Sequence, residues 1–443
     1  MDADARRALA ARILERSPAD ATEAIVTSDH RALTRFTHEL IHQNVDIENV
    51  AIRVRAIVDG RTGVASTNAT GERAIETVVA RAIEIAAFAP HGIDVPSLAG
   101  PADVTPPGGA YVDATANATA AERANVASAI FEQAGAGGCW CSGYVTTSSS
   151  GVTVATTAGA DVSFDGTECG ANVKMTAGDS TGFAERYAGD AGVLDGTALG
   201  ARAAQKARSS ADPVTVDPGE WTVILEPPAF GELVMFLAGH FSAQSYHEGS
   251  SFLTERLGER VMGSGVTIRD DYAHPLHPGA PFDWEGTPKQ RVALIENGVA
   301  NAVVTDSAWS RKLNRPNTGH GLPAPNAQGP YPLDLVVEPG RESLDELIAG
   351  TKRGLLVTRL WYTRIVDQRK TILTGMTRDG TFLIEDGRLT RGVRNLRFNQ
   401  SLVDALETCT FSSEQRRTGG YSYALVTPAV KFDRFAFASS TDY

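Results

Sequence analysis

Alternating and β-branched residues dominate the first half of the chain and predict strands. Residues 24–26, 41–45 and 50–58 carry this pattern, and Asp59-Gly60 is a turn signal that starts a hairpin. The same pattern recurs at residues 144–147, 152–156, 162–164, 172–175 and 182–187. We expect four or five short strands in that stretch, and their spacing is typical of an antiparallel sheet.

Apolar residues at three- and four-residue steps predict helices between these strands. The clearest helix covers residues 72–88, where such steps place the apolar side chains on one face. Further helices are predicted at residues 120–133, 195–208 and 343–350, with a short amphipathic helix at the start of the chain. The glycine-rich residues 135–138 predict a break after the second of these helices.

The Pro- and Gly-containing residues 209–219 predict a connection between two domains. We therefore expect an α+β fold, with an N-terminal α/β domain of mostly antiparallel sheet over residues 1–212. A C-terminal strand-rich domain would cover residues 213–443. It opens with a strand at residues 221–225, followed by a central apolar helix over about residues 229–247.

Composition and charge narrow the function classes. The chain has 443 residues, 42% of them hydrophobic, and a net charge of −12 without a Lys/Arg cluster, so nucleic acid is not an expected partner. No apolar run reaches the roughly 18 residues of a membrane span, and the start of the chain lacks a signal-like core. With four cysteines and no disulfide pattern, we expect a cytoplasmic protein.

The central apolar helix ends in His240, where catalytic chemistry would be placed. A helical zinc peptidase needs a second imidazole nearby and a Glu to deprotonate the bound water. The positions five and four residues before His240 hold Met235 and Phe236. Neither residue supplies a usual zinc ligand or a general base, so the helix has the frame of an enzyme site without its chemistry.

His240 and His247 would lie on nearly the same face of one continuous helix, with Glu248 beside them. Seven residues separate the two side chains by about 10 Å at 1.5 Å per residue, and the spacing matches no zinc motif. The pattern therefore favours residues that line a polar cleft or the surface over a metal site.

Three other groups have candidate chemistry. His274 and His277 lie in a Pro-rich acidic loop that is typical of an ordinary loop. Cys139 and Cys141 lack the spacing of a redox pair, and Cys169 and Cys409 complete no zinc motif, so buried cysteines are expected. Thr318-Gly319-His320 combines a histidine with a backbone that allows close approach of a ligand, but these residue types favour a plain surface turn.

Several segments, taken in order, resemble the TldD/TldE (PmbA) family of peptidase subunits over nearly the whole chain. They are residues 34–44, 54–63, 249–252, 257–261, 282–286, 294–298, 317–320, 374–387, 393–399 and 428–432. The resemblance implies an N-terminal α/β domain and a C-terminal strand-rich domain. It also implies a TldD/TldE pair that encloses a peptide-cleaving chamber.

The family's catalytic subunit carries H-E-x-x-x-H on the central helix, with a cysteine near the C-terminus as a further metal ligand. In this chain the first His of that motif is Met235, the Glu is Phe236, and only His240 is kept. Cys409 lacks the Gly-flanked setting of the family ligand, so we carry no ligand role over to it. The resemblance thus implies a TldE-type subunit without metal, and zinc is expected in a TldD-like partner.

Three hypotheses follow. The first is a non-catalytic TldE/PmbA-like subunit that pairs with a TldD-like metalloprotease and helps to hold an extended peptide, with His240, His247, Thr318, Gly319 and His320 facing the chamber. The second is a self-sufficient metallohydrolase whose altered site uses His240, His247, Glu248 and His320. The third is a homodimeric binding or scaffold protein without a protease partner.

Overall fold

The computed structural model describes residues 1–91, 97–419 and 424–440. Its first half contains helices α1 (Ala3–Arg16), α2 (Glu72–Phe88), α3 (Asp113–Ala116), α4 (Ala120–Gly137) and α5 (Gly196–Ser209), and the 3₁₀ turn η1 (Ala191–Val193). Its strands are β1 (Ala21–Thr37), β2 (Leu40–Val58), β3 (Arg61–Thr67), β4 (Trp140–Thr156), β5 (Asp161–Ala177) and β6 (Ser180–Ala188).

The second half is richer in strands. Its helices are α6 (Pro227–Val234), η2 (Met235–Phe241), α7 (Ala243–His247), α8 (Ser307–Leu313), α9 (Leu344–Ala349) and α10 (Leu402–Ala405). Its strands are β7 (Gly219–Leu225), β8 (Ile268–Asp270), β9 (Val292–Glu296), β10 (Val299–Ala300), β11 (Leu335–Val337), β12 (Arg353–Asp367), β13 (Ile372–Glu385), β14 (Arg388–Gly392), β15 (Leu396–Ser401), β16 (Cys409–Thr418) and β17 (Leu425–Ser440).

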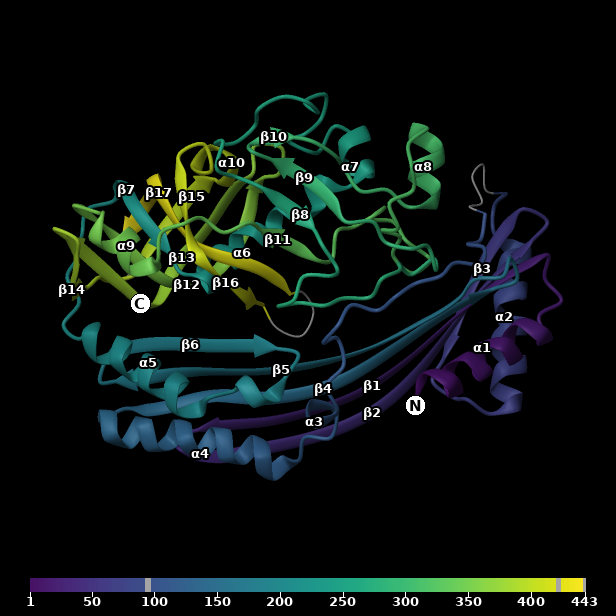
Figure 1. The fold of residues 1–443 in the computed structure, drawn as a ribbon, viewed down its shortest axis with the longest axis horizontal. Coiled ribbons are helices and arrows are strands. Elements are labelled where there is room, and N and C mark those ends of the chain that lie inside the picture. The colour runs from purple at the N-terminus through teal and green to yellow at the C-terminus, as the bar shows by residue number, and fades with distance from the viewer. Residues whose placement is uncertain (92–96, 420–423, 441–443) are drawn as a thin grey trace.

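The first six strands form one antiparallel sheet in the order β3-β2-β1-β4-β5-β6, and the later strands form a second, mixed sheet of eleven strands. Figure 1 shows the first sheet running along the molecule with the second half stacked above it. The chain therefore has the α+β fold that the sequence predicts. The domain boundary between residues 212 and 213 stays a prediction, although no strand crosses it.

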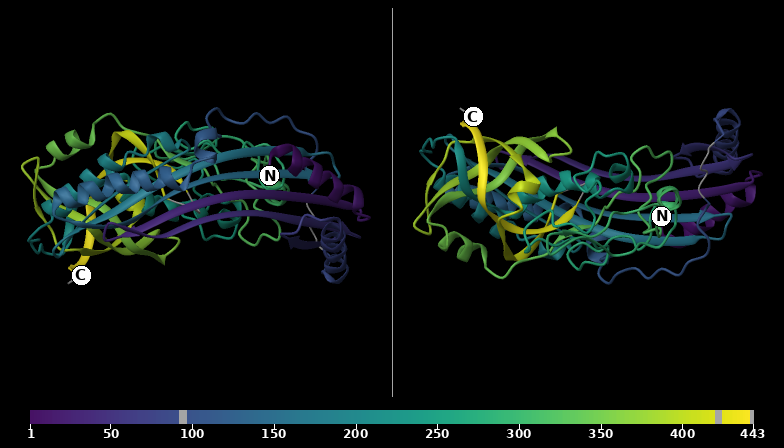
Figure 2. Two further views of the ribbon diagram at one scale, coloured as in Figure 1. Left: turned by 90° about the horizontal axis from the view of Figure 1, so that it is seen from below. Right: turned by 90° about the horizontal axis from the view of Figure 1, so that it is seen from above.

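The strands of the first sheet are longer than the sequence pattern predicts. The expected strands at 41–45 and 50–58 are one strand, β2, and those at 144–147 and 152–156 are one strand, β4. At about 3.4 Å per residue a 17-residue strand spans about 55 Å. Both views in Figure 2 show these purple to teal strands following most of the length of the molecule.

Such long strands carry two separate cores instead of one. At one end α1 and α2 pack on β1, β2 and β3, and at the other end α4 and α5 pack on β4, β5 and β6. Two buried arginines lie between these cores. Arg6 donates to Ser28, Thr153 and Asp165, and Arg123 donates to Thr34 and Thr147.

The polar residues in the middle of the strands are thus partners of buried guanidinium groups. A buried charge requires hydrogen-bond acceptors. The gaps between the predicted pairs of strands fall instead at residues 46–49 and 148–151, where the mostly polar sequences Asp-Ile-Glu-Asn and Ser-Ser-Ser-Gly interrupt the hydrophobic alternation.

The helices at residues 72–88, 120–133 and 195–208 are confirmed as α2, α4 and α5. The predicted break at residues 135–138 is wrong in its position, because α4 continues through Gly137. It ends at Gly138, whose φ of 63° is the left-handed conformation favoured for a helix-terminating glycine.

Two glycines set how closely the helices approach the first sheet. A Cβ on Gly63 of β3 would overlap the carbonyl oxygen of Ala82 and the amide nitrogen of Ala86 in α2. A Cβ on Gly182 of β6 would meet Ala203 and Ala207 of α5 in the same way. In both places the opposing atoms are backbone, so a larger residue forces the whole helix to move.

We expect Gly63→Ala and Gly182→Ala each to lower the free energy of unfolding by about 3 kcal/mol, the upper part of the usual range for overpacking. Gly135→Ala is the control, because no atom lies near its Cβ position in α4 and alanine favours a helix. Urea unfolding measures the free energy of unfolding of the three variants. Equal effects at the three glycines would contradict the argument from close packing.

Candidate functional site

The predicted central apolar helix begins directly after β7, a strand of the second sheet. Glu226 precedes α6, and Pro227 and Pro228 occupy its first positions, where a proline is favoured because no backbone N–H is required. The following residues, 235–241, form the 3₁₀ turn η2. Every buried side chain of α6 belongs to the core of the second half or lies beside it.

The predicted continuous helix over residues 229–247 is wrong. The chain leaves the helix at Ser242, which has extended backbone angles and caps α7 through its hydroxyl group. The backbone N–H of Val304 donates to Phe241, and that of Ala243 donates to Val304. Because these groups bond to a distant segment, they cannot continue the helix, and the inference that His240 and His247 share a face no longer applies.

Met235 and Phe236 lie where the resemblance implies a metal ligand and a base. The Met235 side chain is 37% exposed, and Phe236 packs against the core of the second half. Zinc binds imidazole nitrogen, thiolate sulfur or carboxylate oxygen atoms that converge on one point. A thioether directed to the surface and a phenyl ring directed to the core do not provide such donors, so these residues do not fit a zinc site.

His240 is buried, and its imidazole is part of a local packing unit. Its Nδ1 accepts a hydrogen bond of 3.3 Å from the backbone N–H of Phe252, and its carbonyl oxygen accepts one of 2.7 Å from the hydroxyl of Ser251. Burial lowers the pKa of His240 to about 4. The ring is therefore neutral at pH 7 and supports the turn at residues 251–253.

His247 lies apart from His240 on the surface. Its ring is 5.6 Å from that of Trp309, and its neighbour Glu248 accepts a hydrogen bond from Gln244. Among the residues that the structure describes, no group of three or more His, Cys, Asp or Glu side chains is placed to hold a metal ion. The ligand set of the second hypothesis is thus not brought together.

The Thr318-Gly319-His320 segment is packed inside the protein and is not the plain surface turn that its residue types also fit. His320 Nε2 lies 3.0 Å from Asp270, and its Nδ1 lies 2.9 Å from the Thr318 hydroxyl. A Cβ at Gly319 would overlap the carbonyl of Pro288, and its φ is +69°, so glycine is required there. Both ring nitrogens of His320 are engaged, which leaves neither for a peptide.

His277 of the Pro-rich loop joins the same polar cluster. Its Nε2 is 3.6 Å from Asp334, which also pairs with Lys289, and the backbone N–H of Asp334 donates to Asp270. Burial lowers the pKa of His277 well below its ordinary value. The cluster is paired internally, and it connects the loops around residues 270–290 with those around 318–334.

The cysteines behave as ordinary core residues. Cys141 and Cys169 are buried, Cys139 and Cys409 are half-buried, and all four are free. Burial raises the pKa of Cys141, Cys169 and Cys409 to about 12. These thiols are therefore protonated at neutral pH, which agrees with the structural role expected for them.

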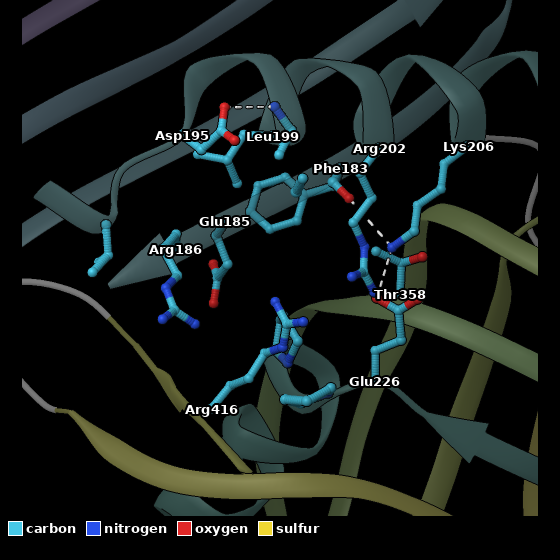
Figure 3. A pocket seen from close by; sticks show the side chains of 15 residues that line it. Phe183, Glu185, Arg186, Asp195, Leu199, Arg202, Lys206, Glu226, Thr358 and Arg416 are labelled. Carbon is cyan, nitrogen blue, oxygen red and sulfur yellow. Dashed lines mark hydrogen bonds and ion pairs between the residues drawn. The ribbon is translucent and has the colours of Figure 1, made fainter. Parts of the chain in front are cut away.

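A cavity of about 360 Å³ lies between the two halves of the chain. Figure 3 shows the side chains that line it, which come from β6, α5, the β7–α6 junction, β12 and β16. Lys206 and Arg202 of α5 pair with Glu226 at 2.6 and 3.4 Å. Burial alone would raise the pKa of Glu226, but Lys206 and Arg202 together lower it, so this carboxylate is ionised and joins the halves.

Two family models match the chain. One, described as the PmbA/TldA metallopeptidase C-terminal domain, matches residues 218–439, which is half of the chain. The other, described as the PmbA/TldA metallopeptidase domain 1, matches residues 23–86. The chain belongs to the PmbA/TldD family.

Individual PmbA/TldD proteins show the same relationship at lower coverage. A metalloprotease PmbA homolog of Haemophilus influenzae is 27% identical over 219 residues, or 47% of this chain and 44% of that protein. A metalloprotease TldD homolog of the same organism is 26% identical over 212 residues, or 46% and 41%. The chain spans less than half the length of the curated relatives that it matches.

The fold agrees with that of a solved PmbA/TldD protein. The crystal structure of TldE from Thermococcus kodakarensis matches with a TM-score of 0.89 and 21% sequence identity, and covers 99% of this chain and 100% of that one. The resemblance to the family and the α+β fold are thus confirmed. Among the described residues no helix is long and apolar enough to cross a membrane.

Sequence reasoning located the start of the central helix of this PmbA/TldD chain but missed its break at Ser242 and the charged cavity. Glu185, Arg186 and Arg416 stand in no recognisable motif. One local signal was available, because Arg202 and Lys206 are four residues apart on a predicted helix and present two cations on one face. Such a face requires a carboxylate, which here is Glu226 from beyond the predicted domain boundary.

We expect the neutral state of His240 to make stability depend on pH. Because the folded pKa is about 4 and the ordinary value is 6.5, the unfolded chain binds the proton more tightly. The contribution is complete above pH 6.5 and is lost as the pH falls towards 4, by up to about 3 kcal/mol. His240→Asn keeps an acceptor for Phe252 but does not titrate. Urea unfolding should show that this variant loses less of its free energy of unfolding than the unaltered chain between pH 6.5 and 4. If the free energies of the two proteins fall in parallel with pH, the assignment to His240 is wrong.

Proposed function

We propose that this chain is a non-catalytic TldE/PmbA-like subunit that pairs with a TldD-like metalloprotease and helps to enclose an extended peptide. The observation that carries the proposal is the chemistry around His240. Met235 and Phe236 replace donors with apolar groups, and His240 is buried with its Nδ1 already accepting a hydrogen bond. Hydrolysis of an amide needs an activated water and a proton acceptor, and these residues supply neither.

The partner is proposed to be a TldD-like chain that keeps H-E-x-x-x-H and binds zinc. Support comes from membership of the PmbA/TldD family and from the similarity to TldE in fold. In this arrangement α6 and η2 are retained as a packed wall of the second half. We propose a cytoplasmic location for the complex, in keeping with the cysteine usage.

The free edge of β2 supports the holding of extended chains. β2 pairs with β1 along its length, but with β3 only over residues 52–58. Among the described residues, no strand pairs with the outer side of residues 40–51. An extended peptide or a partner strand can add to such an edge through backbone hydrogen bonds. Of the side chains proposed to face the chamber, that of His247 is exposed, while His240, Thr318, Gly319 and His320 would support the wall from behind.

We expect the purified chain to contain no stoichiometric zinc and to cleave no peptide by itself. Co-expression with a paralogue that retains H-E-x-x-x-H should give a complex that cleaves unstructured peptides and is inhibited by a chelator. Mass-resolved gel filtration, metal analysis and a fluorogenic peptide assay measure these properties. The control is the same complex in which the Glu of the partner's motif is replaced by Gln.

Two outcomes would overturn the proposal. One equivalent of zinc with chelator-sensitive cleavage by the chain alone would indicate a self-sufficient metallohydrolase. A stable homodimer that forms no complex with the paralogue would indicate the scaffold alternative.

A further inference from the structure

The cavity between the two halves contains more cationic groups than its carboxylates can match. Arg186 of β6, Arg202 of α5 and Arg416 of β16 all line it, together with Lys206. Figure 3 shows the side chains of these three arginines reaching into the same space from different elements. The cluster therefore depends on the docking of one half on the other.

Two of the three carboxylates that line the cavity already have hydrogen-bond or ion-pair partners. Glu226 is shared by Lys206 and Arg202, and Asp195 accepts a hydrogen bond of 2.9 Å from the backbone N–H of Ala198 as the cap of α5. Within the part of the chain that the structure describes, Arg416 has one ion-pair partner, the exposed Glu414, at 3.7 Å. Burial lowers the pKa of Arg416, and the charges of Arg202 and Arg186 lower it further. A bound anion would relieve this repulsion.

Glu185 is the remaining carboxyl group of the cavity. Burial raises its pKa to about 7, against the opposing effect of Arg359. At neutral pH it is therefore protonated in a large fraction of molecules, and a protonated carboxyl group can donate a hydrogen bond to an anion. Its charged form would repel an anionic ligand bound in the same cavity.

Apart from Thr358, the rest of the wall is apolar. Phe183, Leu199, Val193, Pro227 and Pro228 line the space beside the arginines. A cavity of about 360 Å³ accommodates one or two amino-acid residues of a ligand but no larger body. Guanidinium groups bind carboxylates through two parallel hydrogen bonds, which ammonium groups cannot do.

We propose that this cavity binds the terminal carboxylate of a peptide, with the carboxylate on Arg186 and Arg416 and the last side chain, an apolar one, against Phe183 and Leu199. That the ligand is a peptide rests on the proposed function. The preference for a carboxylate rests on the cavity alone. Binding is therefore measured on the isolated chain, without a TldD-like partner and without hydrolysis.

The test uses fluorescence polarisation of a pentapeptide that carries a dye at its N-terminus and ends in Leu with a free carboxylate. The same peptide with an amidated end should bind at least tenfold more weakly, as expected when a hydrogen-bonded charge is lost. Equal binding of the two would overturn the proposal. Amidated peptide with Asp as its last residue, and inorganic phosphate as competitor, test other anions. If either binds as well as the free acid, the assignment to a peptide terminus is wrong.

Substitutions in the cavity should change affinity in opposite directions. Arg416→Gln and Arg186→Gln should each weaken binding about tenfold, whereas Glu185→Gln should strengthen it severalfold by removing the competing charge. Arg208→Gln, on an exposed position of α5 outside the cavity, is the matched control and should leave affinity unchanged. If the cluster served only to join the two halves, Glu185→Gln would not strengthen binding. That result would overturn the proposal even where an arginine variant fails to fold.

Discussion

The buried carboxylate of Glu226 is the contact on which the relation between the two sheets depends. It lies at the point where β7 ends and α6 begins, and its partners Arg202 and Lys206 belong to a helix of the other half. Removing one member of a buried ion pair leaves an uncompensated charge, which is far more costly than losing an exposed pair. The pairing of Glu226 therefore favours contact between the two halves at α5, and all three charged residues line the cavity there.

In the second half, two of the candidate histidines are held by internal hydrogen bonds. His240 is neutral and packed, and the loop of His320 is held by Asp270 and Thr318. These histidines, which sequence alone makes candidates for catalysis, thus hold neighbouring loops in place through hydrogen bonds. Histidine and aspartate serve in catalysis as well as in structure. A catalytic role requires ligand atoms that have no other partner and that point to one shared site.

Local patterns predicted the parts of the fold that local interactions determine. The helices α2 and α5 were predicted within one residue because each buries one face of an amphipathic pattern. The break at Ser242 was missed because it depends on backbone bonds to Val304, 61 to 63 positions further along. That positions 235 and 236 carry no usual zinc ligand and no general base could be read from the sequence, since it concerns two adjacent residues. The arginine cavity was not, because its residues lie between positions 183 and 416.

Among the described residues no strand pairs with the outer edge of β2 at residues 40–51, and a peptide added there would be selected by its conformation instead of by its sequence. A strand edge offers backbone donors and acceptors at a fixed repeat of about 7 Å for every second residue, and any extended chain matches that repeat. A folded protein does not, because its own helices and sheets already use those groups. An edge of this kind at residues 40–51 would distinguish unfolded segments from native proteins by backbone conformation alone.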